Sequence, residues 1–205
     1  EEWPAELDHY AIVTQGLSIK TPLHRVVSHV YNDMWRALNK VHQLGYRRPG
    51  LVIGRYEEVR SAHAYLCVYL GWSQLVLGAP AAIPVLQLEH VEEKPFVSWL
   101  GQHKPDVVLF VHHYDNLAAF ETILRQQRIR VPGDLGIAAI SQSLAGTQFS
   151  GLQENQHLIG AWAVDLLVSR ILNRDFGIPT HPRIEMVERQ WIDGKTLREG
   201  RTGYP

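Results

Sequence analysis

Asp106-Val107-Val108-Leu109-Phe110-Val111 is the stretch of this sequence that decides its fold class. Its consecutive apolar residues do not alternate with polar ones, which is typical of a parallel β-strand that helices cover on both faces. Similar buried strands are predicted at 50–53 and 135–140. Because helical patterns separate these runs, in strand–helix units of roughly 25–30 residues, the sequence predicts an α/β protein with parallel sheets and right-handed crossovers.

The segments around these strands have the periodicity of helices and of further strands. Between Val30 and Leu44 apolar residues recur at helical spacing, and Gly45 then ends the pattern. Pro84 indicates that the strand predicted around it begins near this residue or lies at a sheet edge. The remaining helices are predicted at 57–69, 95–103, 115–127 and 156–172, and the remaining strands at 10–14, 83–88 and 184–187.

Composition narrows the class of protein. The chain has 205 residues, which fits one large domain or two small ones. Its formal net charge is −1, which argues against these residues gripping DNA themselves, because such binding rests on a basic surface that neutralises several phosphates. Cys67 is the only cysteine, which excludes an intrachain disulfide and favours a cytosolic setting, although many periplasmic proteins also lack disulfides. No apolar run approaches the roughly 20 residues of a membrane span.

The motifs of common enzyme classes are absent from the sequence. There is no G-x-G-x-x-G fingerprint after a strand, no phosphate-binding Walker loop and no G-x-S-x-G nucleophile turn. The acids Glu57 and Glu58 are neighbours in a predicted helix, so they point in different directions and make a poor acid–base pair. Among the 11 histidines, pairs such as His24 with His29 lack the helical spacing and third ligand of a zinc site. The sequence therefore predicts no metal, no cofactor and no catalysis.

Polar and aromatic residues gather in the loops that follow the predicted strands. Parallel α/β sheets bind ligands at the carboxyl ends of their strands, so these loops predict a pocket for a small molecule. The alternative, that loops are simply polar, accounts for any one of them more easily than for all. The loops are Gln15-Gly16-Leu17-Ser18, Gly54-Arg55-Tyr56, Glu89-His90, His112-His113-Tyr114 and Ser141-Gln142-Ser143.

Three blocks of the sequence, in order and at matching spacing, resemble segments of the lac repressor-type (LacI/GalR) family of transcription regulators. The first is Leu44-Gly45-Tyr46-Arg47-Arg48-Pro49-Gly50-Leu51-Val52, where a helix ends before a strand. The second is Val131-Pro132-Gly133-Asp134-Leu135-Gly136-Ile137, a turn and strand. The third is Gly160-Ala161-Trp162-Ala163-Val164-Asp165-Leu166-Leu167, within a helix. The resemblance covers essentially the whole chain.

This resemblance implies a type I periplasmic-binding-protein-like fold, with two parallel-sheet subdomains around a cleft. Residues 1–27 and 153–188 would form the N-terminal effector subdomain, and residues 28–152 and 189–205 the C-terminal one. Family members also carry a helix-turn-helix headpiece and earlier strand–helix units of the first subdomain. Both are expected to lie outside these residues.

The function implied by the resemblance is that of a cytoplasmic, dimeric, ligand-responsive transcription regulator. The chain would be its effector-binding core and would sense a sugar or sugar derivative, while an upstream helix-turn-helix segment binds operator DNA. Two alternatives remain open. A periplasmic solute-binding protein of a transporter shares the fold, and an enzyme on a doubly wound sheet is compatible with the fold alone.

The effector site that follows from these positions departs from the family pattern. His112 stands where sugar-binding members place an asparagine, Ser141 where they place an aspartate, and Gln156 where an aromatic residue stacks on the sugar. Arg60 is near the family's effector-contacting arginine, but Tyr65 occupies the region of its glycine. We therefore expect an anionic ligand such as a sugar acid, with a neutral saccharide or a vestigial cleft as alternatives. The predicted contacts are Gln15, Arg60, Glu89, His112, Tyr114, Ser141, Gln142 and Gln156.

A dimer interface is predicted for the apolar residues of the 115–127 helix and of the loop after Ile140. In the family, these positions lie in or near the two-fold interface of the C-terminal subdomain. The alternative is an ordinary helix stripe that faces the core. The predicted interface residues are Leu117, Phe120, Leu124, Leu144 and Phe149.

Overall fold

The structure is a computed structural model that describes residues 4–78, 82–111, 115–141, 144 and 147–199. The chain divides into two compact units. Unit 1 comprises Glu1–His29 and Asn155–Arg189, and unit 2 comprises Val30–Glu154 and Gln190–Pro205. The subdomain boundaries predicted after residues 27, 152 and 188 fall one or two residues before the ends of these segments. In the described ranges, no helix has both the length and the apolar character needed to cross a membrane.

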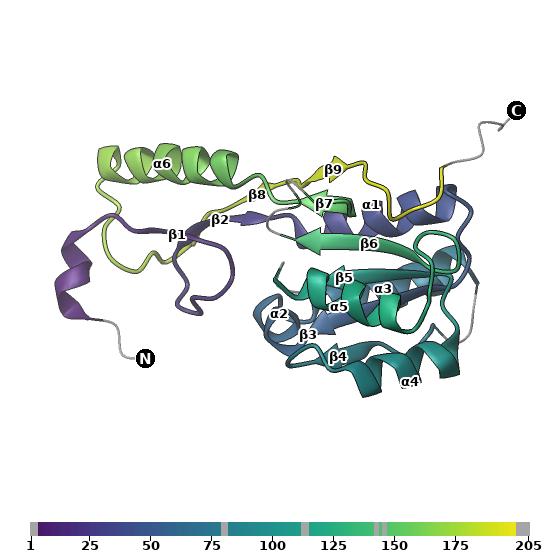
Figure 1. The fold of residues 1–205 in the computed structure, drawn as a ribbon. Coiled ribbons are helices and arrows are strands. Elements are labelled where there is room, and N and C mark those ends of the chain that lie inside the picture. The colour runs from purple at the N-terminus through teal and green to yellow at the C-terminus, as the bar shows by residue number, and fades with distance from the viewer. Residues whose placement is uncertain (1–3, 79–81, 112–114, 142–143, 145–146, 200–205) are drawn as a thin grey trace, which may run out of the picture. The chain divides into compact units, whose positions relative to one another are not determined.

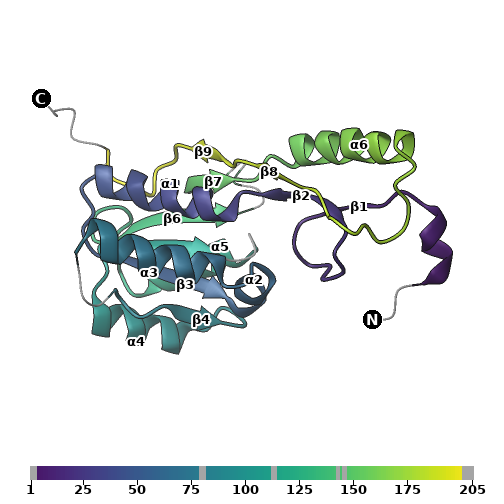
Figure 2. The same cartoon turned by 180° about the vertical axis from the view of Figure 1, so that it is seen from behind.

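Unit 2 contains a six-stranded sheet with strand order β4-β3-β5-β6-β7-β9 (Figures 1 and 2). All neighbouring strands are parallel except β7 and β9, which are antiparallel. The α/β class with parallel pairing, predicted from the run at 106–111, is confirmed. The strands are β3 (Pro49–Gly54), β4 (Leu86–Leu88), β5 (Val107–Val111), β6 (Gly136–Ser141), β7 (Ser150–Gln153) and β9 (Gln190–Ile192).

Helices cover both faces of this sheet. α1 (Val30–Gln43) and α3 (Ala64–Val76) supply one hydrophobic core, and α4 (Glu93–His103) and α5 (Asp115–Gln126) supply the other. The central strand β5 contributes Leu109 and Val111 to the first core and Val108 and Phe110 to the second. This alternation explains why the strand is apolar at every position: both of its faces are buried.

The single helix predicted at 57–69 is wrong, because the structure has two helices in this region. α2 (Arg55–Arg60) ends where Ala62 and His63 adopt left-handed backbone angles, with φ of 51° and 64°, and α3 then begins at Ala64. Hydrogen bonds to the carbonyl of Glu58 from the Ser61 hydroxyl and the His63 amide close this break. The apolar periodicity continues through it, which is why the sequence pattern did not show the interruption.

The strand predicted at 83–88 is shorter in the structure. β4 covers only Leu86–Leu88 and is an edge strand, as Pro84 indicated. The carbonyl of Pro84 instead accepts a hydrogen bond of 2.7 Å from the indole of Trp99 in α4. The segment before β4 is therefore fixed by a side chain rather than by a strand partner.

Unit 1 contains a three-stranded parallel sheet of order β1-β2-β8, with α6 (Gln156–Leu172) packed on it. The strands are β1 (Val13–Gln15), β2 (His24–Ser28) and β8 (Ile184–Val187), and the short 3₁₀ helix η1 (Ala5–His9) precedes them. Ile159, Ala163 and Leu166 of α6 form a core with Val26 and Val187 of the sheet. α6 and β8 have the bounds predicted from the sequence.

Two buried polar side chains hold β2 in place. The guanidinium of Arg25 donates to the carbonyls of Ile19, Thr21 and Leu23 at 3.1, 2.7 and 3.3 Å. The Nδ1 atom of His24 accepts the backbone N–H of Arg183 at 2.9 Å, so its Nε2 carries the proton that it donates to Asp175 at 3.0 Å. These bonds satisfy groups that would otherwise be costly to bury.

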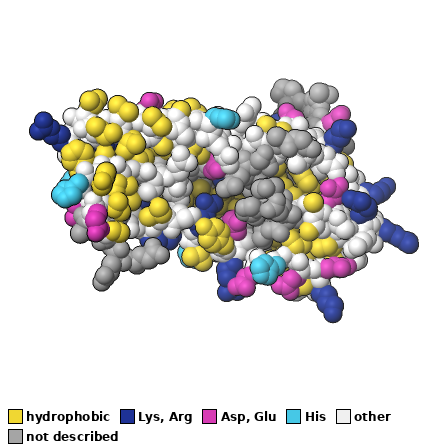
Figure 3. All heavy atoms as spheres, turned by 60° about the vertical axis from the view of Figure 1, so that its left-hand side comes forward, with side chains coloured by type: hydrophobic (Ala, Val, Ile, Leu, Met, Phe, Trp, Pro, Cys, Tyr) yellow, Lys and Arg dark blue, Asp and Glu magenta, His cyan; other side chains and the backbone are white. Residues whose placement is uncertain are grey.

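Hydrophobic side chains also gather on the surface of unit 1 (Figure 3). α6 is apolar on the side away from the sheet as well as on the side that faces it, a pattern typical of a helix that is buried on both sides. The exposed apolar residues of α6, β8 and the segment that joins them are Trp162, Val164, Val168, Ile171, Leu172, Phe176, Ile178, Ile184 and Met186.

The turn between α5 and β6 is closed by an exposed ion pair, which lowers the pKa of its carboxylate. The guanidinium of Arg130 donates two hydrogen bonds to the Asp134 carboxylate, at 2.9 and 2.7 Å, and the Arg130 backbone N–H donates a third at 2.9 Å. These bonds lower the pKa of Asp134 from 3.8 to about 2, and the side-chain bonds contribute more than the backbone bond. We expect a carboxyl NMR titration to give this low pKa in the wild-type chain and a higher one in Arg130→Ala.

The lowered pKa of Asp134 also determines how the stability of the folded chain depends on pH. Because the pKa of Asp134 is lower in the folded chain, the stabilisation is fully present above the ordinary value of 3.8 and is lost as the pH falls through about 2. Arg125→Ala, which removes another exposed arginine near the same turn, is the matched control and should leave the pKa of Asp134 unchanged. An Asp134 pKa that stays low in Arg130→Ala would contradict the side-chain bond as its main cause.

Candidate functional site

The carboxyl ends of five parallel strands meet at one edge of the unit 2 sheet. Gly54 of β3 lies beside Leu88 of β4, and Ile53 lies beside Val111 of β5. The register continues to β6 and β7, where Ser141 is paired with Gln153. The loops that the sequence placed after β3, β4, β5 and β6 therefore begin next to one another, at the edge where parallel sheets bind ligands.

An ion pair joins the first two of these loops. Arg55, the first residue of α2, and Glu89, which follows β4, approach within 3.4 Å, and both side chains are about two-thirds exposed. At this exposure the pair contributes little to stability. Its two charges are instead available to a ligand at the sheet edge. Glu89 was predicted as a site residue; Arg55 was not, although it lies within one of the predicted loops.

Arg60 has a hydrogen-bond donor that no described residue accepts. It lies in the last turn of α2, with its guanidinium carbon 5.8 Å from the centre of the Tyr56 ring. Its Nε is buried and has no hydrogen-bond partner among the described residues. Buried donors in native structures are usually paired, and the exceptions call for an explanation such as a ligand. Arg60 is therefore the strongest described candidate for a ligand contact in unit 2.

Two predicted residues come together at one end of unit 1. Gln15 ends β1 and Gln156 begins α6, and both are exposed. The side-chain nitrogen of Gln15 lies 4.0 Å from the position that a Cβ on Gly160 would occupy. Because Gly160 is one helical turn after Gln156, both amides lie near the start of α6. The side chain of Asn155 caps this helix by accepting the N–H of Leu158 at 3.1 Å.

The other predicted contacts are less fully described. Ser141 is the last residue of β6. His112, Tyr114 and Gln142 lie outside the described residues. Beside Ser141, the Gln153 side chain accepts the backbone N–H of Leu144 at 2.8 Å and so ties the segment after β6 to β7. Gln153 was not predicted as a site residue because the sequence indicated no strand there.

The prediction that five apolar residues form a dimer interface must be corrected. All five belong to the core between the sheet and helices α4 and α5, and none exposes more than 4% of its surface. The Phe120 ring, for example, packs 4.3 Å from that of Phe110 and 5.0 Å from that of Phe96, centre to centre. The stripe on α5 therefore faces the core, as in the alternative interpretation. The residues concerned are Leu117, Phe120, Leu124, Leu144 and Phe149.

The arrangement offers binding rather than an evident reaction centre. Within the part of the chain that the structure describes, no group of three or more His, Cys, Asp or Glu side chains could hold a metal ion. What the described residues provide at the sheet edge is a cation, an anion and an unused donor, from Arg55, Glu89 and Arg60. Such convergent polar groups suit a small polar ligand.

Comparison with known proteins gives one family match. Residues 38–197 match the periplasmic binding protein-like domain family. This range includes all five parallel strands of unit 2 and their carboxyl ends. None of the curated proteins matches the sequence.

Solved structures share the fold at low sequence identity. The transcriptional regulator CelR, in complex with cellobiose, has a TM-score of 0.66 and 18% identity, over 90% of this chain and 58% of that one. A periplasmic binding protein/LacI transcriptional regulator from Alkaliphilus metalliredigens, in complex with D-xylulofuranose, has a TM-score of 0.69 and 15% identity, with coverages of 91% and 70%.

The lac repressor dimer bound to operator and the anti-inducer ONPF has a TM-score of 0.70 and 14% identity, over 91% of this chain and 56% of that one. The chain thus spans between 56% and 70% of the length of these three proteins. The predicted periplasmic-binding-protein-like fold is confirmed by the family match and by these structures.

Proposed function

Because the chain belongs to the periplasmic binding protein-like domain family, we propose that it is the effector-binding core of a ligand-responsive transcription regulator that senses a sugar or sugar derivative. The observation that carries the proposal is the family match over residues 38–197, which coincides with the sheet whose carboxyl edge gathers polar loops. The regulators of similar fold, two of them with bound sugars, support this choice.

The proposed effector contacts are those predicted from the sequence. Gln15, Arg60, Glu89 and Gln156 would each contribute a polar side chain. Tyr114, Ser141 and Gln142 would add polar contacts from the remaining loops, together with His112. We propose no catalytic role for any of them, and no cofactor.

A sugar acid is the ligand class that these groups favour. The unused donor of Arg60 can bond a carboxylate, and charge-assisted bonds of this kind are roughly twice as strong as neutral ones. A histidine at 112 can gain a second donor near neutral pH. The bound ligands of two of the similar structures are neutral sugars, cellobiose and D-xylulofuranose, so both ligand classes belong in the test.

The test is a ligand screen on the full-length protein. Uronic and aldonic acids would be compared with their parent sugars by thermal unfolding, and each positive result would be confirmed by titration calorimetry. A ligand at a hundred times its dissociation constant stabilises the folded state by about 2.7 kcal/mol, enough to shift the unfolding temperature clearly. Absence of a shift with every sugar and sugar acid tested would contradict the proposal.

In the regulator we propose, effector binding changes DNA affinity by shifting a conformational equilibrium. The effector must bind two conformations of the protein with different affinity, and couplings of this kind are typically about 1–3 kcal/mol. We propose a cytoplasmic homodimer in which a helix-turn-helix segment outside residues 1–205 contacts operator DNA. The dimer contacts must involve residues other than the five that are buried in the core.

Residues 1–205 alone are expected not to bind DNA tightly. Their net charge is −1, whereas proteins that grip DNA neutralise several phosphates and lose affinity steeply as salt rises. Fluorescence anisotropy with labelled duplex DNA, at about 50 and 200 mM salt, measures both properties. Tight, salt-sensitive binding by these residues would overturn the division between an effector core and a separate DNA-binding segment. If the full-length protein bound sugars but no DNA, a transporter's solute-binding protein would be the better assignment.

A further inference from the structure

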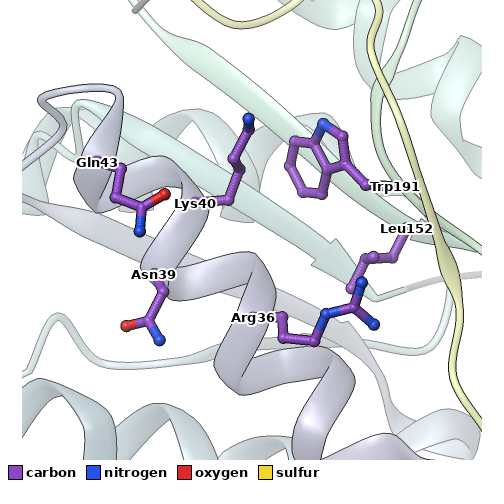
Figure 4. A pocket seen from close by; sticks show the side chains of 6 residues that line it. All are labelled: Arg36, Asn39, Lys40, Gln43, Leu152 and Trp191. Atoms are coloured by element: carbon purple, nitrogen blue, oxygen red, sulfur yellow. The ribbon is translucent and has the colours of Figure 1, made fainter.

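A pocket lies in unit 2 between α1 and the strands β7 and β9 (Figure 4). Its volume is about 370 Å³, toward the small end of the roughly 300–1,000 Å³ typical of ligand sites. None of the eight proposed effector contacts lines it. Its lining residues are Arg36, Asn39, Lys40, Gln43, Leu152 and Trp191.

The polar wall of this pocket is one face of α1. Residues 36, 40 and 43 are spaced one helical turn apart, so they form a row on the same side of the helix. A separate row, which includes Met34, Leu38 and Val41, is buried in the core of unit 2. The division of α1 into two rows therefore presents cationic and amide groups to the pocket.

The opposite wall is apolar and aromatic. Leu152 of β7 is fully buried, and Trp191 of β9 is its antiparallel partner in the sheet. The indole N–H of Trp191 donates to the Asp193 carboxylate at 2.8 Å, which fixes the orientation of the ring. In Figure 4 the indole ring and the Leu152 side chain lie across from the side chains of α1. The pocket therefore combines a flat apolar surface with positive charge.

Two groups of the polar wall, the Lys40 ammonium and the Gln43 amide, can still form an ion pair or hydrogen bonds with a ligand. The Lys40 ammonium lies 5.8 Å from the centre of the Trp191 ring, and no carboxylate of a described residue pairs with it. The Gln43 amide is exposed and makes no hydrogen bond to another described residue. Asn39 differs, because its oxygen accepts the Trp72 indole N–H at 2.8 Å, which leaves only its amide nitrogen for a ligand. Arg36 adds a second positive charge and lies 3.8 Å from the Asp33 carboxylate.

We infer that this pocket binds a small aromatic anion, whose planar ring packs on the indole of Trp191 while its carboxylate or phosphate lies between Arg36 and Lys40. The volume admits one ring system with one acidic group. The Lys40 ammonium, which now lies over the indole, would move to the anion as the ligand ring takes its place on the indole face. An aromatic ring gains from offset stacking on tryptophan, and an anion gains from the two cations.

The experiment measures the contributions of the ring and of the charge to binding separately, and it compares a carboxylate with a phosphate. Adenosine 5′-monophosphate and indole-3-acetate each carry a ring and an anion. Adenosine and indole-3-acetamide lack the charge, and ribose 5-phosphate and acetate lack the ring. Binding is followed on the full chain through the indole N–H resonance of Trp191, which Trp191→Phe assigns. We expect at least one ring-bearing anion to shift this resonance saturably, with at least tenfold higher affinity than its neutral and ringless counterparts.

Variants then locate the site. Arg36→Ala and Lys40→Ala should each weaken binding of that anion at least fivefold, whereas Lys40→Arg should retain most of it. Lys94→Ala, which removes an exposed lysine on α4, is the matched control and should have no effect. Arg60→Ala should also leave this binding unchanged, which separates the pocket from the proposed effector site. Equal binding of the neutral or ringless counterparts, unchanged binding in Arg36→Ala and Lys40→Ala, or no saturable shift would each overturn the inference.

Discussion

Replacement of Gly151 by alanine is expected to destabilise unit 2 more than a methyl group added to any other glycine whose surroundings the structure describes. Gly151 lies in β7 with φ of +154°, and a Cβ there would be 1.9 Å from the carbonyl oxygen of Ala139. Ala139 is its paired neighbour in β6, so the clash is between backbones that are hydrogen-bonded to each other. Overpacking and backbone strain each cost about 1–3 kcal/mol, so we expect a loss of about 2–6 kcal/mol.

Gly101→Ala is the matched control for this substitution. Gly101 lies in α4, and apart from its chain neighbours and the backbone of its own helix no described atom is within 4 Å of the position that its Cβ would take. Because alanine is favoured over glycine in a helix by about 1 kcal/mol, this variant should be as stable as the wild type or slightly more so. Denaturant unfolding of both variants measures the difference in the free energy of unfolding. A Gly151→Ala chain within 0.5 kcal/mol of the wild type, roughly the size of an ordinary surface change, would contradict the close approach of β6 and β7.

The parts of the fold that the sequence predicted are those with a strong local pattern. β5 could be predicted because both of its faces are buried, which makes every position apolar. α6 could be predicted with its bounds because its apolar residues continue through the whole helix, from the first turn after Asn155 to Leu172. In both elements the pattern depends on the residues themselves and not on a partner far along the chain.

The strands that were missed depend on distant partners. β2 begins with His24 and Arg25, which read as polar and exposed in the sequence but are buried in the structure. His24 is satisfied by Asp175 and Arg183, which are far away in the chain. β7 and β9 are short and pair with each other although 39 residues separate Leu152 from its partner Trp191. Local periodicity carries no information about such pairs.

The sequence could predict where the candidate site lies but not which side chains contact one another there. Parallel pairing alone places the loops after β3 and β4 side by side. The ion pair between Arg55 and Glu89, and the Arg60 Nε that no described residue pairs, are seen only in the structure. The apolar stripe of α5 was assigned to an interface because a core stripe and an interface stripe have the same spacing in sequence. The pocket on α1 was missed because Trp191 reaches it only through β9.

Arg60→Ala is expected to weaken effector binding by about 10- to 150-fold. Hydrogen bonds to charged groups contribute about 1.5–3 kcal/mol, and 1.4 kcal/mol corresponds to a factor of ten in affinity. The Nε of Arg60 has no hydrogen-bond partner among the described residues, so its removal should cost little stability while it removes a ligand contact. Calorimetric titration with the sugar or sugar acid found in the ligand screen measures the change. Thermal unfolding of the variant verifies that it remains folded.

A control variant and a comparison of a sugar acid with its parent sugar show which ligand group Arg60 contacts. Arg125→Ala removes an exposed arginine on α5 and should leave effector affinity unchanged. Arg60→Lys keeps the charge but loses the planar fork, so it should recover only part of the affinity for a carboxylate. If the effector is a sugar acid bound through Arg60, the alanine variant should lose more affinity for the acid than for its parent neutral sugar. Equal losses for the two ligands would show that Arg60 bonds a hydroxyl group instead, and no loss for either would remove Arg60 from the site.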